Sequence, residues 1–309
     1  MLDIAGAVSS VEHDAHAAQH GDGKALAALH RELGALSPSD LNRVAEGVQK
    51  NMGESSSHYS KVEINRDEQG SVMSLEFSPS IAERAKSWLE GSVAHALHVT
   101  ITPINNVNAS PEMVQRANAA FRALAPAVRE TLLKGGIEVR TVDKIPDASR
   151  VFWRPWLTQS IHPHPRGYPD GATWENNSGY QDSDKIYMAE HYRGLSDGKI
   201  YKDDRIEATL RHESGHRLDN LLGGSYGNYS DSQEFKAAYQ QDIAKVPAED
   251  RRVLDYYLQK SGGRSETFAE QFAILNGGGA CTPQAEFLLA KYFGNTAALI
   301  QKKLDKLKP

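Results

Sequence analysis

The alternation of apolar and polar residues divides the chain into a mixed first part and a mainly helical second part. Apolar residues recur at every second position on both sides of Arg66–Gly70, at Val62 and Ile64 and again from Met73 to Phe77, which predicts a β-hairpin. Helical spacing and capping residues predict helices at 22–35, 38–50, 80–90 and 110–133, the last bent at Pro126. Strands are predicted at 95–104 and 137–142.

The polar stretch Asn105–Ser110 separates these two parts. We therefore expect an N-terminal module of unknown role at 1–105, built from helices and a hairpin, and a second domain at 106–309. Further helices are predicted at 232–245, 248–259 and 283–307. The expected fold class is α+β: a mainly helical second domain with a small sheet, preceded by a smaller mixed module.

The chain's most informative segment is H-E-x-x-H, at His212, Glu213 and His216. It lies in a predicted helix, with Asp203 and Asp204 expected at its start and Gly223-Gly224 at its end. Histidines four residues apart share one helix face, so both can bind one tetrahedral Zn²⁺.

Glu213 follows the first of these histidines, within reach of a zinc-bound water that has become acidic. These three residues predict metal-assisted peptide hydrolysis with Glu213 as general base. The alternative is a solvated surface helix that carries two histidines by chance.

A catalytic zinc ion needs a third protein ligand and leaves its fourth position to water. A later predicted helix carries Glu266 and Glu270 on one face, and Phe268, Phe272 and Leu275 on the other, which we expect to be buried. Glu266 is the candidate third ligand, and Glu270, one turn further, could orient a ligand histidine. The alternative is an exposed acidic face of an amphipathic helix.

The pair H-E-x-G-H-x-x-D (His212–Asp219) and E-x-F-A-E-x-F (Glu266–Phe272) resembles the anthrax lethal factor-like gluzincins, a family that includes the Pro-Pro endopeptidases. The resemblance covers roughly the last 200 residues. It implies a zincin-type metalloprotease domain with His212, His216 and Glu266 as ligands of one Zn²⁺ and Glu213 as general base. It further implies that Asp219 and Glu270 support those ligands.

The family usually has a catalytic tyrosine seven residues before the glutamate ligand, where this chain has Gln259. Tyr256 and Tyr257 lie slightly earlier, and Ser261-Gly262-Gly263 follows, so this loop differs from the family pattern. Either tyrosine could stabilise the oxyanion, or both could simply pack on a helix.

Two segments before the H-E-x-x-H helix are candidates for substrate binding. Phe152–Tyr180 is irregular and aromatic, and we expect it to line the cleft, with Trp174 as a contact, or else to form a small satellite core. His162 and His164 lie here, but their spacing makes a weak metal site.

Lys185–Glu190 reads as a strand, and by resemblance it would be the free sheet edge beside the zinc. An extended substrate could pair with that edge, with Tyr187 and Met188 in contact with it.

Composition narrows the function without naming a target. The net charge of −5 argues against nucleic acid, and no apolar run approaches the length of a membrane span. No ordinary secretory signal is visible, and the single cysteine excludes an internal disulfide and fits a reducing compartment.

We therefore expect a monomeric, soluble zinc endopeptidase that acts on a protein or peptide. It would be either cytoplasmic or a bacterial effector or toxin exported without a cleavable signal. The alternative function is a non-catalytic interaction protein whose zinc site is degenerate or structural.

Overall fold

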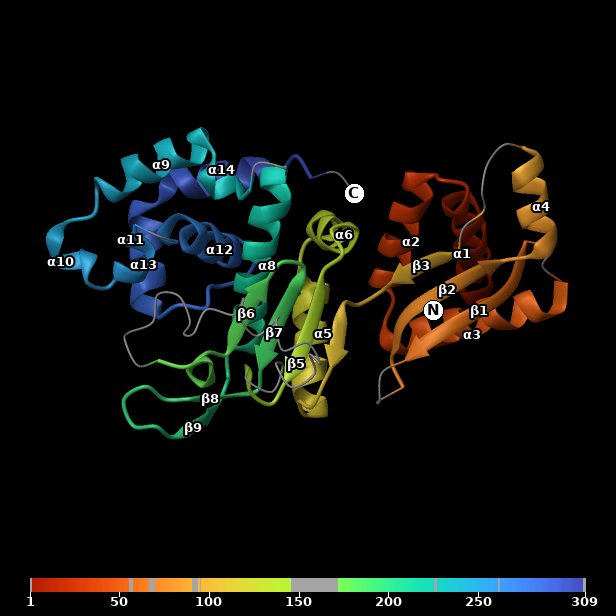
Figure 1. Ribbon diagram of the computed structural model, residues 1–309, viewed down its shortest axis with the longest axis horizontal. Helices are drawn as coiled ribbons and strands as arrows, with labels where there is room; N and C mark the ends of the chain where they lie inside the picture. Colours follow the sequence, from red (N-terminus) through yellow and green to blue (C-terminus); the bar gives the residue numbers. More distant parts are fainter. Residues whose placement is uncertain are drawn as a thin grey trace, which may run out of the picture. The chain divides into compact units, whose positions relative to one another are not determined.

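The computed structural model describes residues 2–55, 58–66, 70–90, 94, 96–145, 172–224, 227–260 and 262–307. The chain forms two compact units, Met1–Pro103 and Ile104–Lys308 (Figure 1). Helices predominate and the sheets are small, so the expected α+β class is confirmed. No helix in the described ranges combines the length and the apolar character needed to cross a membrane.

The first unit packs helices on a three-stranded antiparallel sheet. The sheet has the order β1-β2-β3, and the predicted hairpin is confirmed, with Val62 opposite Phe77 and Ile64 opposite Leu75. Phe77 and Leu75 are fully buried in the core. The elements are α1 (Ile4–Gln19), α2 (Gly23–Ala35), α3 (Pro38–Ser55), β1 (Tyr59–Arg66), β2 (Val72–Pro79), α4 (Ile81–Leu89) and β3 (Leu97–Thr100).

Helix α1 was not predicted. Its buried positions are Val8, Val11, Ala15 and Gln19, and the small or polar side chains at the last two give little apolar signal. The single strand expected at 95–104 is wrong as well. It divides at Pro103, which lacks a backbone N–H, into β3 in the first unit and β4 in the second.

The second unit contains a four-stranded mixed sheet with the order β4-β5-β7-β6. Its strands are β4 (Ile104–Asn106), β5 (Glu138–Val142), β6 (Gly179–Asp182) and β7 (Lys185–Ala189). Strands β4, β5 and β7 run parallel, and β6 pairs antiparallel with β7. Between β4 and β5 the chain forms two helices, α5 (Pro111–Ala123) and α6 (Pro126–Lys134), where one bent helix was expected.

The expectation that Lys185–Glu190 offers a free sheet edge is wrong. Strand β7 is paired with β5 on one side and with β6 on the other. Tyr187 and Met188 are buried, so neither can meet a substrate along a β7 edge. Strand β6 has β7 as its partner in this sheet and forms one of its two edges, with β4 at the other.

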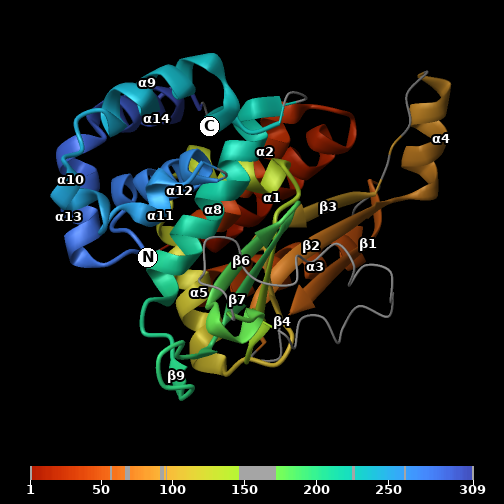
Figure 2. The ribbon, with the colours of Figure 1, turned by 60° about the vertical axis from the view of Figure 1, so that its left-hand side comes forward.

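Helix α8 (Ile206–Gly223) occupies the centre of the second unit. It packs against α12 (Gly263–Leu275) on one side and against β6 and β7 on the other, as Figures 1 and 2 show from two directions. The helix begins later than expected. The carboxylate of Asp203 lies before it and accepts hydrogen bonds from the Arg205 N–H and the Thr209 hydroxyl.

The remaining elements complete the second unit. The helix expected at 248–259 is broken into α10 and α11, and the last one is broken into α13 and α14 at Phe293, whose side chain is buried. The bounds are β8 (His191–Arg193), β9 (Ile200–Lys202), α9 (Gln233–Ile243), α10 (Ala248–Arg251), α11 (Asp255–Leu258), α13 (Pro283–Tyr292) and α14 (Gly294–Leu304), with short 3-10 helices at Trp174–Asn176 and Tyr229–Asp231.

The backbones of helices α8 and α12 come close together at Gly215. A Cβ atom there would lie 2.8 Å from the Cα and 2.9 Å from the carbonyl oxygen of Ala269. Backbone atoms cannot move aside as a flexible side chain can, so only glycine permits this spacing. The expectation that Phe268 and Phe272 are buried is confirmed, whereas Leu275 is 39% exposed at the end of α12.

Gly215→Ala should force the two helices apart. We expect a loss of about 1–3 kcal/mol in the free energy of unfolding, because the added methyl group meets backbone. Gly34→Ala is the matched control, since nothing lies within 4 Å of its Cβ position in α2. That variant should be neutral or more stable by up to about 1 kcal/mol. Denaturant unfolding measures both, and equal stability of the two variants would contradict the assigned constraint.

Candidate metal centre

Three side chains from α8 and α12 bring one nitrogen or oxygen atom each to a common point. The Nε2 atoms of His212 and His216 lie 3.2 Å apart, and each lies 3.3 Å from Oε2 of Glu266. The three atoms form a nearly equilateral triangle. The sequence predicted the two histidines from helical spacing, and the fold brings the glutamate to them from another helix.

The triangle has the dimensions of a zinc site. Ligand atoms at ordinary Zn–N and Zn–O distances are separated by about 3.3–3.5 Å around a tetrahedral ion. Oε2 of Glu266 is buried and makes no hydrogen bond within the described structure, so the protein alone leaves this oxygen unsatisfied. These residues therefore fit a divalent cation, and they are one of two groups of potential ligands in the described residues.

The carboxylate of Glu266 is ionised. Burial acts to raise its pKa, but the imidazoles of His216 and His212 outweigh that effect and bring the pKa well below its usual range. The pKa values of both histidines are raised, because the neighbouring carboxylates outweigh the lowering effect of burial. A cation at the triangle would be stabilised by the same negative charge.

The far nitrogen of each imidazole is held in place by the protein. Nδ1 of His212 lies 2.6 Å from Oε2 of Glu270, and the backbone N–H of Cys281 donates to the other oxygen of that carboxylate. Glu270 is fully buried and its pKa is lowered, since hydrogen bonds and charge from His212 outweigh burial. An ionised carboxylate can only accept a hydrogen bond, so in the neutral imidazole Nδ1 carries the proton and Nε2 is left with a lone pair that a metal ion can bind.

His216 is oriented by a longer chain of hydrogen bonds. Its Nδ1 lies 3.1 Å from Oγ of Ser265, which lies 3.4 Å from Oδ2 of Asp219. Asp219 in turn accepts from the backbone N–H and the hydroxyl of Ser230. Burial raises the pKa of Asp219 to about 6. Sequence reasoning missed Ser265 and Ser230, because nothing in their local spacing marks them.

Glu213 lies on the same helix but belongs to no ion pair among the described residues. It lines the cavity beside the triangle and is 8% exposed. Burial raises its pKa, against the lowering effect of His212 and His216. A carboxylate with a raised pKa is a stronger base than an exposed one.

An open cavity of about 860 Å³ gives access to these residues. Trp174 and all four residues of β6 form one side of it, and Tyr256, Tyr257 and Gln259 contribute from another. Gly179 brings β6 close to α8, because a Cβ there would lie 2.8 Å from Oε1 of Glu213. Sequence reasoning did not single out this glycine or β6.

The other candidate residues are placed as follows. Tyr257 is buried at the cavity wall, and burial raises the pKa of its hydroxyl far above the ordinary value. Tyr256 is half-buried and packs edge-on against it, with ring centroids 5.3 Å apart. The Trp174 ring packs edge-on against the Tyr180 ring, with ring centroids 4.5 Å apart. The other aromatic residues of the segment expected to line the cleft, Trp153, Trp156 and Tyr168, lie outside the described residues, as do His162 and His164.

Comparison with known proteins adds one similarity. No family model and no curated protein matches the chain. Among solved structures, the Pro-Pro endopeptidase PPEP-2 from Paenibacillus alvei aligns with 65% of this chain and 96% of its own, at 15% identity and a TM-score of 0.42. With identity and TM-score this low, the proposals below rest on this chain's own residues.

The contact between His212 and Glu270 makes a pH-dependent contribution to stability when a chelator keeps the protein free of metal. The folded-state pKa of His212 lies above 6.5, so the contribution is fully present below pH 6.5 and is lost as pH rises through the raised value. Glu270→Gln should therefore cost most stability at acidic pH and progressively less at alkaline pH. Denaturant unfolding across pH measures this.

Glu249→Gln, the same substitution at an exposed position, serves as the control and should show no such trend. A cost of Glu270→Gln that grows as pH rises would contradict the assigned proton position.

Proposed function

We propose that this protein is a zinc-dependent endopeptidase that hydrolyses a peptide bond in a protein or peptide substrate. The observation that carries the proposal is the triangle of His212, His216 and Glu266 on the wall of an open cavity, with Glu213 beside it. Three protein ligands and an accessible fourth position are the arrangement that catalytic zinc sites use.

Each residue then has a defined role. A Zn²⁺ ion bound by the three ligands would polarise the scissile carbonyl and lower the pKa of a coordinated water to about 7. Glu213 takes the proton from the attacking water and delivers it to the leaving amine. Its raised pKa suits both halves of that transfer, because the group must gain and lose a proton near neutral pH. Glu270, and Asp219 through Ser265, hold the two imidazoles in position.

Tyr257 and Tyr256 are the candidates for stabilising the oxyanion. The pKa of Tyr257 is raised mainly by burial and further by Glu270, so its hydroxyl stays protonated and can donate a hydrogen bond. Both side chains line the cavity from α11, the helix just before the loop that departs from the gluzincin pattern.

The substrate would pair with β6. The Ala189 N–H donates to the Ser178 carbonyl, so the alternating ladder turns the backbone groups of Tyr180 toward β7 and those of Gly179 and Gln181 away from it. An extended peptide added along β6 would meet these outward groups. It would pass Glu213, because Gly179 packs directly on that side chain.

The competing function is a non-catalytic protein with a structural zinc ion. It is favoured by Gln259 at the position where the related family has tyrosine. Metal content alone does not separate the two functions, whereas cleavage of a diverse peptide library followed by mass spectrometry does. Zinc binding without any cleavage would favour the structural role.

Two variants of adjacent residues separate metal binding from catalysis. His212→Gln should lose one zinc ion per chain. Glu213→Gln should keep that ion while kcat falls about 100- to 10,000-fold, since only the base is removed. Zinc analysis and library cleavage measure both. Glu207→Gln on the same helix, paired with Arg116 and outside the cavity, is the control and should retain activity. Full zinc content in His212→Gln would refute the ligand assignment.

Proline at Gln181 tests the β6 edge. It removes one outward N–H without breaking a hydrogen bond to β7, so zinc content should persist while kcat/KM falls about tenfold, as expected for one lost hydrogen bond. Gln181→Ala keeps the N–H and should retain near-normal KM. If both variants cleave like the unmodified protein, the substrate does not pair with β6.

A further inference from the structure

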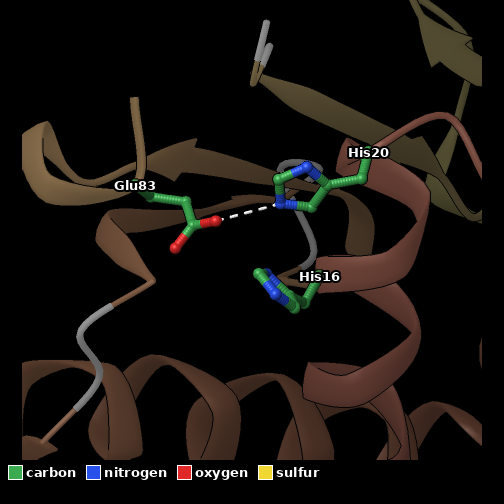
Figure 3. A group of neighbouring side chains, drawn as sticks. All are labelled: His16, His20 and Glu83. Carbon is green, nitrogen blue, oxygen red and sulfur yellow. Dashed lines mark hydrogen bonds and ion pairs between the residues drawn. The ribbon is translucent and has the colours of Figure 1, made fainter. Parts of the chain in front are cut away.

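A second group of metal-binding side chains lies in the first unit, on elements that the proposed peptidase site does not use. His16 lies in the last turn of α1, His20 is the residue that follows the helix at its C-cap, and Glu83 faces them from the first turn of α4 (Figure 3). One potential ligand atom of each residue lies within 4.8 Å of the other two. The histidines are four residues apart, the same spacing as His212 and His216.

Glu83 is the centre of this group. It is only 3% exposed, although a buried carboxylate is costly unless it is paired. Its Oε1 lies 3.0 Å from Nε2 of His20, and its Oε2 lies 3.0 Å from Nδ1 of His58, the residue just before β1. Imidazoles thus surround the carboxylate, and His58 fixes its orientation.

His16 completes the group but is not satisfied by it. Its ring centroid lies 4.8 Å from that of His20 and 4.1 Å from that of His58. Its Nδ1 is buried and has no hydrogen-bond partner among the described residues. The group therefore has three imidazoles around one carboxylate. One buried ring nitrogen, Nδ1 of His16, makes no hydrogen bond among the described residues, so the group has capacity to bind a metal ion.

The attachment of α4 shows what such a site could do. The buried residues of this helix are the polar Glu83 and Ser87, whereas its apolar Ile81, Trp88 and Leu89 are 86%, 76% and 78% exposed. Helices usually pack through an apolar face. Here Glu83 links α4 to His20 and His58, so an ion bound to Glu83 and to the histidines of α1 would strengthen this attachment.

We propose that His16, His20 and Glu83 form a second metal site, for a divalent transition-metal ion of the Zn²⁺ class. Two imidazoles and a carboxylate are a donor set that such ions prefer. His58 acts as a positioning residue that holds the second carboxylate oxygen. Because His20 is exposed, the ion can enter from solvent.

Zinc content of the full-length chain tests the proposal. After removal of metal and re-equilibration with Zn²⁺, the unmodified protein should bind two ions. His16→Gln/His20→Gln should bind one, His212→Gln/His216→Gln should bind one, and the combination should bind none. His13→Gln, an exposed histidine on α1, is the matched control and should bind two. Equal zinc content in the unmodified protein and in His16→Gln/His20→Gln would overturn the proposal.

The same series separates this site from the peptidase site. If only the peptidase site failed, the unmodified protein would bind one ion, and His16→Gln/His20→Gln would bind none. A second measurement does not depend on folding of the α1 variants. Co²⁺ added to His212→Gln/His216→Gln should give visible absorption of an imidazole-ligated ion and should perturb the NMR signals of His16 and His20. Unchanged spectra would overturn the second site.

Discussion

The close approach of α8 and α12 at Gly215 and Ala269 is the constraint on which the candidate site depends. Both histidines lie on α8 and the carboxylate ligand on α12, so the spacing of the two helices sets the size of the triangle. Backbone atoms of Ala269 lie less than 3 Å from the position that a Cβ of residue 215 would take, so a side chain there would push the two helices apart. The same crossing brings Glu270 within 2.6 Å of His212. One glycine therefore fixes the ligand geometry and the support of a ligand at once.

Local sequence patterns were sufficient to predict those features that depend on a single helix or a single hairpin. The facing of His212 and His216 follows from helical periodicity, and the β1–β2 pairing follows from strict alternation around a turn. Breaks within helical stretches were predicted poorly. A new helix begins at Pro126 and at Gly294, and the chain is interrupted between α10 and α11. Packing decides whether a helix bends at such a point or ends and is followed by another.

Features that depend on tertiary structure could not be read in the same way. The strand at Lys185–Glu190 was expected to be a free sheet edge, yet Ile186, Tyr187, Met188 and Ala189 are all buried in a strand with two neighbours. A continuous apolar run is typical of such central strands, and this signal was available. The support of His216 by Ser265 and Ser230 gave no signal at all, because α12 and the 3-10 helix at Tyr229–Asp231, which carry these hydroxyls, reach Asp219 only in the folded chain.

The two clusters of histidine and carboxylate, at Glu83 and at Glu266, differ in how the buried carboxylate is hydrogen-bonded. Burying a carboxylate requires partners, and in the first unit both oxygens of Glu83 have imidazole neighbours at 3.0 Å. In the second unit the buried oxygen of Glu266 is left without a hydrogen bond, and separate groups orient the imidazoles. An ion at Glu83 must displace the hydrogen bond to His20 before it can bind, whereas an ion at Glu266 binds an oxygen that makes no hydrogen bond within the described structure. The free energy of binding at the first cluster is reduced by that displaced contact, so zinc should fill the His212 site first.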